Sequence, residues 1–375
     1  MTMSAGLLAV YSASGAAELG PFVHYGLKAM LNRGERAEAY VLTSSGVREV
    51  NVRLAREARV SARGTAAVGC VSPDGGCCAE SPGGVRCAVA GSGTYVELRR
   101  DGVVIARRGT PLWHLALGAH GFDFIVVATE SAAIEILGGS LRRSLLPGET
   151  VEISEMYVRS SREDTSGPLC ALELIYTSRP DSRIDGVEVA AARERAARLL
   201  ASKITFDVDV VTGIPETGAY YAASLAAALG KPYVPAFVVT ERGRSALLDE
   251  TLERVAAAQL KAGIIESAVR DRRVLLVDDS LISGMTIKLA SQLLRHKAGA
   301  LEVYAAIAAP PLRRRCPHGL KMPPESHMLF NAVGPADAMH VLEVDGLVYL
   351  TPGELEAALG ETGLQVCTLC MRRER

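Results

Sequence analysis

Hydrophobic and polar positions follow two different patterns along the chain. In the first third, short runs of β-branched and apolar residues alternate with glycine-rich turns such as 73–76, a pattern typical of strands joined by tight connections. The strands expected there are 7–11, 103–106, 112–117 and 124–128. A helix is expected over about 21–32, because Val23, Leu27, Met30 and Leu31 recur at helical spacing and Gly34 follows as a stop. This part is predicted to be an α+β layered structure.

From about residue 185 onward, helical periodicity alternates with short and almost entirely apolar runs. Such runs are typical of parallel strands that are buried on both faces between helices. The expected helices are 188–202, 217–229 and 286–297, and the expected strands are 208–211, 233–239, 273–277 and 303–308. This order predicts an open, doubly wound α/β sheet. The stretch 159–168 is polar and turn-rich, so we place one domain at 1–160 and a second at 161–375.

Length and charge narrow the classes of function. The chain has 375 residues, more than one hydrophobic core usually serves, which agrees with two domains. Its formal net charge of -1 lacks the basic excess of proteins that bind nucleic acid. No apolar run reaches the roughly 18 residues that span a bilayer, and the start of the sequence lacks the features of a secretory signal. We therefore expect a cytoplasmic protein with neither nucleic acid nor a membrane as partner.

Residues 273–286 carry the clearest candidate chemistry. An apolar strand ends in Asp278 and Asp279, and the chain then turns through Ser280, Gly284 and Thr286 into a helix. In an open α/β sheet, ligands bind beyond the carboxyl ends of the strands. Backbone amides at the start of the helix could hold a phosphate, and the carboxylates could accept hydrogen bonds from ribose hydroxyls or lie close to Mg²⁺. An ordinary capped turn is the alternative, but two adjacent acids after an apolar strand favour a ligand site.

This loop resembles the signature of type I phosphoribosyltransferases, and most closely that of the glutamine phosphoribosyl-pyrophosphate (PRPP) amidotransferases, or amidophosphoribosyltransferases. Further segments are similar to the same family in the same order: 170–176, 179–186, 215–218, 230–233 and 308–311, with 25–34 and 128–137 in the first domain. The resemblance implies an α+β N-terminal-nucleophile (class II glutaminase-like) domain followed by an α/β type I phosphoribosyltransferase domain with a mostly parallel sheet. The residues it assigns to PRPP binding are Asp278, Asp279, Ser280, Gly284, Thr286, Glu216, Thr217, Gly218, Arg244 and Arg254.

Two regions depart from the family. Its catalytic N-terminal cysteine aligns with Ala5, and the asparagine of its oxyanion hole aligns with Ser92, while Gly93 keeps the glycine. Alanine cannot attack an amide, and losing one oxyanion donor costs roughly two to three orders of magnitude in rate. We expect the glutaminase activity to be lost. In the loop 240–254 the family's lysine is missing, and Arg244 and Arg254 could either neutralise pyrophosphate or be solvated surface arginines.

Four cysteines match a metal pattern within the family. A subset of its members holds a 4Fe-4S cluster, and the resemblance assigns the ligands to Cys170, Cys316, Cys367 and Cys370. Four thiolates suit zinc as well as iron by ligand type, and buried structural thiols are a further alternative. The resemblance favours the 4Fe-4S cluster, with zinc kept as the alternative.

The remaining cysteines are Cys70, Cys77, Cys78 and Cys87. Their spacing fits no common metal frame, and disulfides are not expected in a cytoplasmic chain. We interpret them as ordinary or locally redox-active thiols.

Two functional hypotheses follow. The first is a transferase that makes phosphoribosylamine from PRPP, or uses a related ribose-5-phosphate compound, with Mg²⁺ and with ammonia or an amine from a partner. The second is a non-catalytic PRPP or nucleotide sensor, or a regulatory subunit of purine metabolism. Both need Asp278 and Asp279, whereas Ala5, Ser92 and the altered loop favour the second. By analogy with the family, the chain is expected to form a homo-oligomer or a complex with a glutaminase-competent partner.

Overall fold

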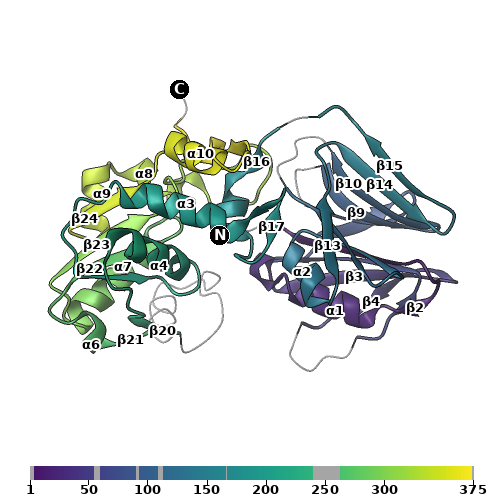
Figure 1. Cartoon of the computed structure of the whole chain (residues 1–375), viewed down its shortest axis with the longest axis horizontal. Coiled ribbons are helices and arrows are strands. Elements are labelled where there is room, and N and C mark those ends of the chain that lie inside the picture. Colours follow the sequence, from purple (N-terminus) through teal and green to yellow (C-terminus); the bar gives the residue numbers. More distant parts are fainter. Residues whose placement is uncertain are drawn as a thin grey trace.

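The computed structural model describes residues 4–54, 60–89, 93–108, 113–165, 167–239 and 262–373. The chain folds into two lobes that lie side by side (Figure 1). The first is built from antiparallel sheets and the second from a parallel sheet with helices. This is the predicted fold class. Among the described helices, none is both long and apolar enough to cross a membrane.

The first lobe contains two antiparallel sheets. A seven-stranded sheet has the order β13-β11-β12-β1-β6-β3-β4, and a six-stranded sheet has the order β15-β14-β10-β9-β8-β7. The strands of the first sheet are β1 Gly6–Ser12, β3 Arg36–Thr43, β4 Gly46–Val50, β6 Ala66–Ser72, β11 Ala116–His120, β12 Phe124–Ala128 and β13 Ser140–Ser144. Those of the second are β7 Cys78–Ser81, β8 Gly84–Ala88, β9 Gly93–Arg99, β10 Gly102–Arg108, β14 Glu149–Ser154 and β15 Val158–Arg162. A small pair, β2 Ala17–Glu18 with β5 Arg63–Gly64, completes the lobe.

Both faces of the seven-stranded sheet are covered. Successive side chains of a strand point to opposite faces, and on β1 Leu7 and Ala9 join the core shared with the six-stranded sheet. Leu8 and Val10 join a second core under the helices α1 Gly20–Lys28 and α2 Ser131–Ile136. Strand β1 is therefore buried along its whole length, which explains why its sequence is continuously apolar.

Two sequence expectations in this lobe need correction. The helix expected over 21–32 ends at Lys28 and is followed by a 3-10 turn, Leu31–Arg33. Val23, Leu27 and Met30 are buried as expected, but Leu31 is 37% exposed. The strand expected over 112–117 begins only at Ala116, and residue 112 lies outside the described residues. The apolar run before Ala116 reflects burial of Trp113 and Leu115 in the core, not a strand.

The second lobe is a doubly wound parallel sheet with the strand order β19-β22-β23-β24. Its strands are β19 Val210–Gly213, β22 Arg273–Asp278, β23 Glu302–Ile307 and β24 Gly346–Tyr349. One face is covered by α3 Val189–Ala201, α4 Gly218–Leu229 and α10 Pro352–Gly360, and the other by α7 Met285–Gln292 and α9 Pro335–Leu342. The shorter elements are α6 Glu266–Val269, α8 Leu329–Ala332, β16 Leu169–Cys170, β17 Arg183–Ile184, β18 Val187–Glu188, β20 Phe237–Val239, β21 Ala262–Ile264 and β25 Val366–Cys367.

Two predicted elements of this lobe differ in extent. The strand expected over 233–239 is regular only at β20, which pairs with β21, and Tyr233 makes a single bridge to Val211 of β19. Pro235 interrupts the strand before β20, because proline has no amide hydrogen to donate to a neighbouring strand. The helix expected over 286–297 is α7 followed by a π-helical segment, Leu293–Lys297.

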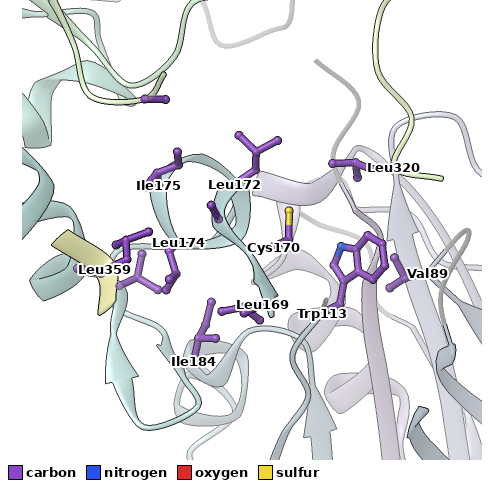
Figure 2. Packing of buried hydrophobic residues seen from close by; sticks show 14 of the residues in the cluster. Val89, Trp113, Leu169, Cys170, Leu172, Leu174, Ile175, Ile184, Leu320 and Leu359 are labelled. Carbon is purple, nitrogen blue, oxygen red and sulfur yellow. The ribbon is translucent and has the colours of Figure 1, made fainter. Parts of the chain in front are cut away.

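The two lobes share one continuous hydrophobic core. Figure 2 shows Trp113 and Val89 of the first lobe packed near Cys170, at the start of the second. Strand β15 keeps the chain in the six-stranded sheet as far as Arg162, and the connection to the second lobe follows it. Because the core passes between the lobes without a break, the first lobe contributes to the stability of the second.

Candidate functional site

The two acids expected to bind a ligand lie where strand β22 ends. Asp278 is the last residue of β22 and Asp279 follows it, and their exposed fractions are 6% and 3%. Strand β22 lies inside the sheet, between β19 and β23. The site therefore sits at the carboxyl edge of a central parallel strand, where ligands of open α/β sheets bind.

A second predicted loop touches the first acid. Thr217, which precedes α4, donates a hydrogen bond from Oγ1 to Oδ1 of Asp278 over 2.9 Å. Gly218 presses against the end of β22, and a Cβ atom there would overlap the carbonyl oxygen of Val277. Glu216 is exposed and has a φ of 70°, which turns the chain sharply before the helix. The loop 215–218 and the acidic turn thus form one surface, although Thr217 and Asp278 are 61 positions apart in sequence.

Burial makes ionisation of the acidic pair costly. It raises the pKa of both Asp278 and Asp279, and the charge of Asp278 raises the pKa of Asp279 further. The backbone amide of Asp279 donates to Oδ1 of Asp278 over 2.9 Å and opposes part of this rise. The guanidinium of Arg193, a buried residue of α3, also lowers the pKa of Asp279. Hydrogen-bond donors or a cation would lower the energy of the charged pair. The hydroxyls of a ribose would be such donors, and Mg²⁺ would be such a cation.

The start of α7 offers groups that suit a phosphate. Ser283, Met285 and Thr286 are exposed there, and helix N-termini present unpaired amides and positive potential. Gly284 precedes the helix with a φ of 78°, a conformation that favours glycine, and a Cβ atom would overlap Leu342. The structure therefore places the acids, the hydroxyl-rich turn and the helix start within one short segment.

Three residues of the candidate sites lie outside the described residues: Arg244, Arg254 and Ser92. Their roles stay predictions.

The position expected to carry the glutaminase nucleophile is buried. Ala5 precedes β1 and is 8% exposed, and Gly93 begins β9. Next to Ala5, the hydroxyl of Ser4 hydrogen-bonds Glu173 and accepts a hydrogen bond from Arg33 Nη1 over 2.7 Å. An apolar methyl group and a serine held by an ion pair offer no free nucleophile at this position among the described residues.

A buried ion network links the lobes and was not anticipated from the sequence. The guanidinium of Arg33 is 2.8 Å from Glu130 and 2.7 Å from Glu173, and all three side chains are almost fully buried. Arg33 also donates to Ser178 over 3.0 Å. Arg33 and Glu130 belong to the first lobe, and Glu173 and Ser178 open the second. The partners are far apart in sequence, so no local pattern could indicate them.

The four cysteines matched to the cluster pattern gather around the C-terminal tail. Strand β16 pairs in parallel with β25, with Cys170 opposite Cys367. The backbone amides of Arg313 and Arg314 donate to the carbonyl oxygen of Cys370, which brings the segment before Cys316 against the tail. All four cysteines are free thiols. Burial, followed by the charges of Glu173 and Cys370, raises the pKa of Cys170, and burial together with the neighbouring Cys316 and Cys367 raises the pKa of Cys370 to about 12.

The other four cysteines correct an expectation. They form two disulfides, Cys70–Cys77 and Cys78–Cys87. We expected ordinary or locally redox-active thiols without a disulfide frame, because a cytoplasmic setting disfavours disulfides. The antiparallel pairing of β7 with β8 instead sets Cys78 directly opposite Cys87, and the sequence spacing gave no sign of it.

A basic cavity opens at the same edge of the parallel sheet. It has a volume of about 720 Å³, and its wall includes Pro310, Arg313, Arg314, Thr351 and Arg372. Pro310 follows β23 and Thr351 follows β24, so both come from carboxyl ends of strands in the sheet that carries Asp278. The arginines of its wall would favour an anionic ligand in this cavity.

Fold and site together define a protein with a phosphoribosyl transferase domain. A family model described as "Phosphoribosyl transferase domain" matches residues 185–322. The amidophosphoribosyltransferase of Mycobacterium tuberculosis (strain H37Rv) is 34% identical over 252 residues, which is 65% of this chain and 48% of the relative. That of Bacillus subtilis (strain 168) is 30% identical over 270 residues, which is 69% of this chain and 56% of the relative. The chain thus spans about half the length of the curated relatives it matches.

One solved structure supports the whole fold. Glutamine phosphoribosylpyrophosphate (PRPP) amidotransferase from B. subtilis, complexed with ADP and GMP, superposes with a TM-score of 0.82. The match covers 98% of this chain and 96% of that chain, at 22% identity. The chain is therefore similar in sequence to amidophosphoribosyltransferases over about half of their length and shares the fold of this structure, so the resemblance and the fold class predicted from its motifs are confirmed.

Proposed function

We propose that this protein binds PRPP together with Mg²⁺ at the acidic turn. The observation that carries the proposal is the 2.9 Å hydrogen bond between Thr217 and Asp278. It joins the two loops that the sequence assigned to one ligand, and it does so at the edge of the sheet where such ligands bind. The homology to amidophosphoribosyltransferases supports the same ligand.

Each part of the site has a separate task. Asp278 and Asp279 accept hydrogen bonds from the ribose hydroxyls, and Mg²⁺ would be held near these acids while it neutralises charge on pyrophosphate. The amides at the start of α7, with Ser280 and Thr286, hold the 5-phosphate. The loop from Glu216 to Gly218 lies against the acidic turn and would contact the pyrophosphate. The buried, raised-pKa acids fit this assignment, because donors and a cation would compensate their charge.

The reaction that best suits these groups is displacement of pyrophosphate from C1 of the ribose. Ammonia, or an amine from a partner, forms the new C–N bond while the C–O bond to pyrophosphate breaks. The transition state is close to an oxocarbenium ion, so the protein contributes position and charge complementarity. Arg244 and Arg254 are proposed to neutralise the leaving pyrophosphate.

Pyrophosphate release separates the enzyme from a sensor. The protein is incubated with Mg-PRPP and ammonium chloride, and pyrophosphate is measured for the wild type, Asp278→Asn and the control Asp337→Asn, which alters an exposed carboxylate of α9. Turnover that Asp278→Asn abolishes and the control keeps would support the transferase. Calorimetric binding of Mg-PRPP without turnover would support the sensor or regulatory subunit. Neither heat nor turnover at millimolar PRPP would refute the site.

We also propose that the first lobe has lost glutaminase activity and acts as a structural or regulatory partner. Ala5 has no nucleophilic atom, and the buried network around Ser4 and Arg33 occupies the adjacent space. Ammonia would then come from solution, from another copy or from a glutaminase-competent partner in the cytoplasm. Glutamate release from glutamine by the purified protein is the measurement, and turnover above the rate without enzyme would refute this part of the proposal.

The C-terminal thiols are proposed to hold a 4Fe-4S cluster that ties the tail to the second lobe. Cys170, Cys316, Cys367 and Cys370 fit the group because all four are free thiols, Cys170 and Cys370 are buried, and the pairing of β16 with β25 sets Cys170 opposite Cys367. Four thiolates suit zinc as well as iron by ligand type, and the family resemblance favours the cluster over a single zinc ion. Anaerobic purification with iron and sulfide analysis is the test, and a colourless protein with stoichiometric zinc would refute the cluster.

A further inference from the structure

The four remaining cysteines join the two sheets of the first lobe. Cys70 lies on β6 of the seven-stranded sheet, while Cys78 and Cys87 face each other on β7 and β8 of the six-stranded sheet. Cys77 ends the loop between β6 and β7. We call these four residues the sheet-joining cysteines. They lie far in sequence from the four thiols discussed above and take no part in the proposed function.

The sulfur atoms of the sheet-joining cysteines converge more closely than two separate disulfides require. Sγ of Cys70 and Sγ of Cys78 belong to different disulfides, yet they are 3.3 Å apart. The sulfurs of Cys70, Cys78 and Cys87 all lie within 4.8 Å of one another. Zinc binds thiolates at about 2.3 Å in a tetrahedron, which sets neighbouring sulfurs about 3.8 Å apart. Cys70, Cys78 and Cys87 therefore already approach the spacing of a single tetrahedral site, and Cys77, which is bonded to Cys70, would supply the fourth sulfur after reduction.

The carboxylate of Glu38 lies beside the sheet-joining cysteines. Glu38 of β3 accepts a hydrogen bond from the backbone amide of Cys78 over 3.2 Å and another from that of Gly76. One of its oxygens lies within 4.8 Å of the sulfurs of Cys70 and Cys77. Glu38 thereby fixes the backbone of the segment that carries Cys77 and Cys78. Cys70 and Cys87 are buried, whereas Cys77 and Cys78 are only partly buried, which leaves a path for a reductant and a metal ion.

We propose that the sheet-joining cysteines bind one zinc ion in the reduced protein, and that the two disulfides are the oxidised form of the same site. Two molecules of a dithiol reductant supply four electrons and four protons. The two S–S bonds break, four thiols form, and each dithiol becomes a disulfide. Zinc then binds the four sulfurs, and their four protons pass to the solvent.

Both forms of the site connect β6 to the hairpin of β7 and β8, so the two sheets stay linked in an oxidising or a reducing environment. Only the reduced, metal-free protein lacks the link. This resolves the conflict between the observed disulfides and a reducing cytoplasm, because zinc replaces the covalent connection there.

The test uses Co²⁺ as a visible substitute for zinc, with the full-length chain. The host is Cys367→Ser/Cys370→Ser, which removes the terminal thiols, and it is compared with the same host carrying Cys77→Ser/Cys78→Ser. After anaerobic reduction with a phosphine, the host is expected to bind one Co²⁺ with the absorption of a tetrahedral thiolate complex, and zinc should displace it. The added serines should abolish the bands. Equal bands in both proteins, or none in the host, would overturn the proposal.

A second measurement does not depend on how the serine variants fold. The reduced host is alkylated with iodoacetamide with and without stoichiometric Zn²⁺, and the modified cysteines are mapped by mass spectrometry. Zinc should slow alkylation of Cys70, Cys77, Cys78 and Cys87 at least tenfold and leave Cys316 unaffected. The same rates with and without zinc would overturn the proposal.

Discussion

Replacing Asp278 with asparagine should weaken ligand binding and stabilise the free protein. The amide oxygen of asparagine can still accept both hydrogen bonds that reach Oδ1, from Thr217 and from the amide of Asp279, each over 2.9 Å. The substitution therefore removes a buried charge while the hydroxyl of Thr217 and the amide of Asp279 keep their acceptor. The charge is what the proposed ribose and Mg²⁺ contacts use, so at least a tenfold loss of PRPP affinity is expected, since hydrogen bonds to charged groups contribute about 1.5–3 kcal/mol.

The size of the stabilisation follows from the pKa of the acid. Burial raises the pKa of Asp278 to about 6 from an ordinary value of 3.8. Each pKa unit corresponds to about 1.4 kcal/mol, so ionised Asp278 costs the folded protein about 3 kcal/mol at neutral pH. The pKa of Asp278 is higher in the folded protein than in the unfolded protein. Protonated Asp278 therefore favours the folded state fully at a pH below the unfolded pKa, and this stabilisation is lost as the pH rises through about 6. The charge of Asp278 also raises the pKa of Asp279, so its removal makes ionisation of Asp279 less costly.

Thermal unfolding of the ligand-free wild type, Asp278→Asn and the control Asp337→Asn measures this effect between pH 4.5 and 8. Asp278→Asn should unfold several degrees above the wild type at pH 7.5, and the difference should shrink toward pH 4.5. The control changes an exposed carboxylate and should follow the wild type throughout. A variant that is less stable at pH 7.5, or a difference that does not change with pH, would refute the reasoning about the buried pair.

Three further predictions concern other parts of the molecule. Arg33→Met should lower the free energy of unfolding by about 3–5 kcal/mol in denaturant titrations, because it leaves two buried carboxylates unpaired; a loss below about 1 kcal/mol would contradict the network. Gly218→Ala should abolish calorimetric PRPP binding, because its Cβ would overlap a carbonyl oxygen of β22, whereas Gly353→Ala, which has open space, should bind normally. Cys367→Ser/Cys370→Ser should lose the iron of anaerobically purified protein and make the tail more sensitive to limited proteolysis; unchanged iron content would place the metal elsewhere.

The parallel half of the fold could be predicted because each signal in it is local. Strand β22 is buried on both faces, so its sequence is an unbroken apolar run, and α3 and α4 show helical periodicity over 13 and 12 residues. The rule that an apolar run forms a strand failed at Trp113, because the apolar run there is buried but has no regular secondary structure. An apolar run reports that a segment is buried, and only additional signals decide its backbone conformation.

Those parts of the candidate site that lie in short sequence motifs could be predicted from the sequence. Asp278 and Thr217 belong to short segments with recognisable patterns, and the parallel sheet brings such segments to one edge. The partners of Arg33 and the pairing of Cys70 with Cys77 depend on how separate segments pack together, and single-sequence patterns do not encode this packing. Connectivity among several cysteines cannot be deduced from sequence, and a buried ion pair between lobes has no periodicity to reveal it.

The buried network also gives the first lobe a task that needs no glutaminase chemistry. Arg33 holds Glu173 at 2.7 Å and Ser178 at 3.0 Å, and so fixes the segment that opens the second lobe. Arg193 of α3 donates to the carbonyl oxygen of Ser178 over 2.6 Å, and its charge lowers the pKa of Asp279. Without the first lobe, Glu173 would be an unpaired acid on an exposed apolar surface, and the support of Arg193 would weaken. Under the proposed loss of glutaminase activity, the first lobe would therefore still hold the segment that opens the second lobe and that Arg193 contacts.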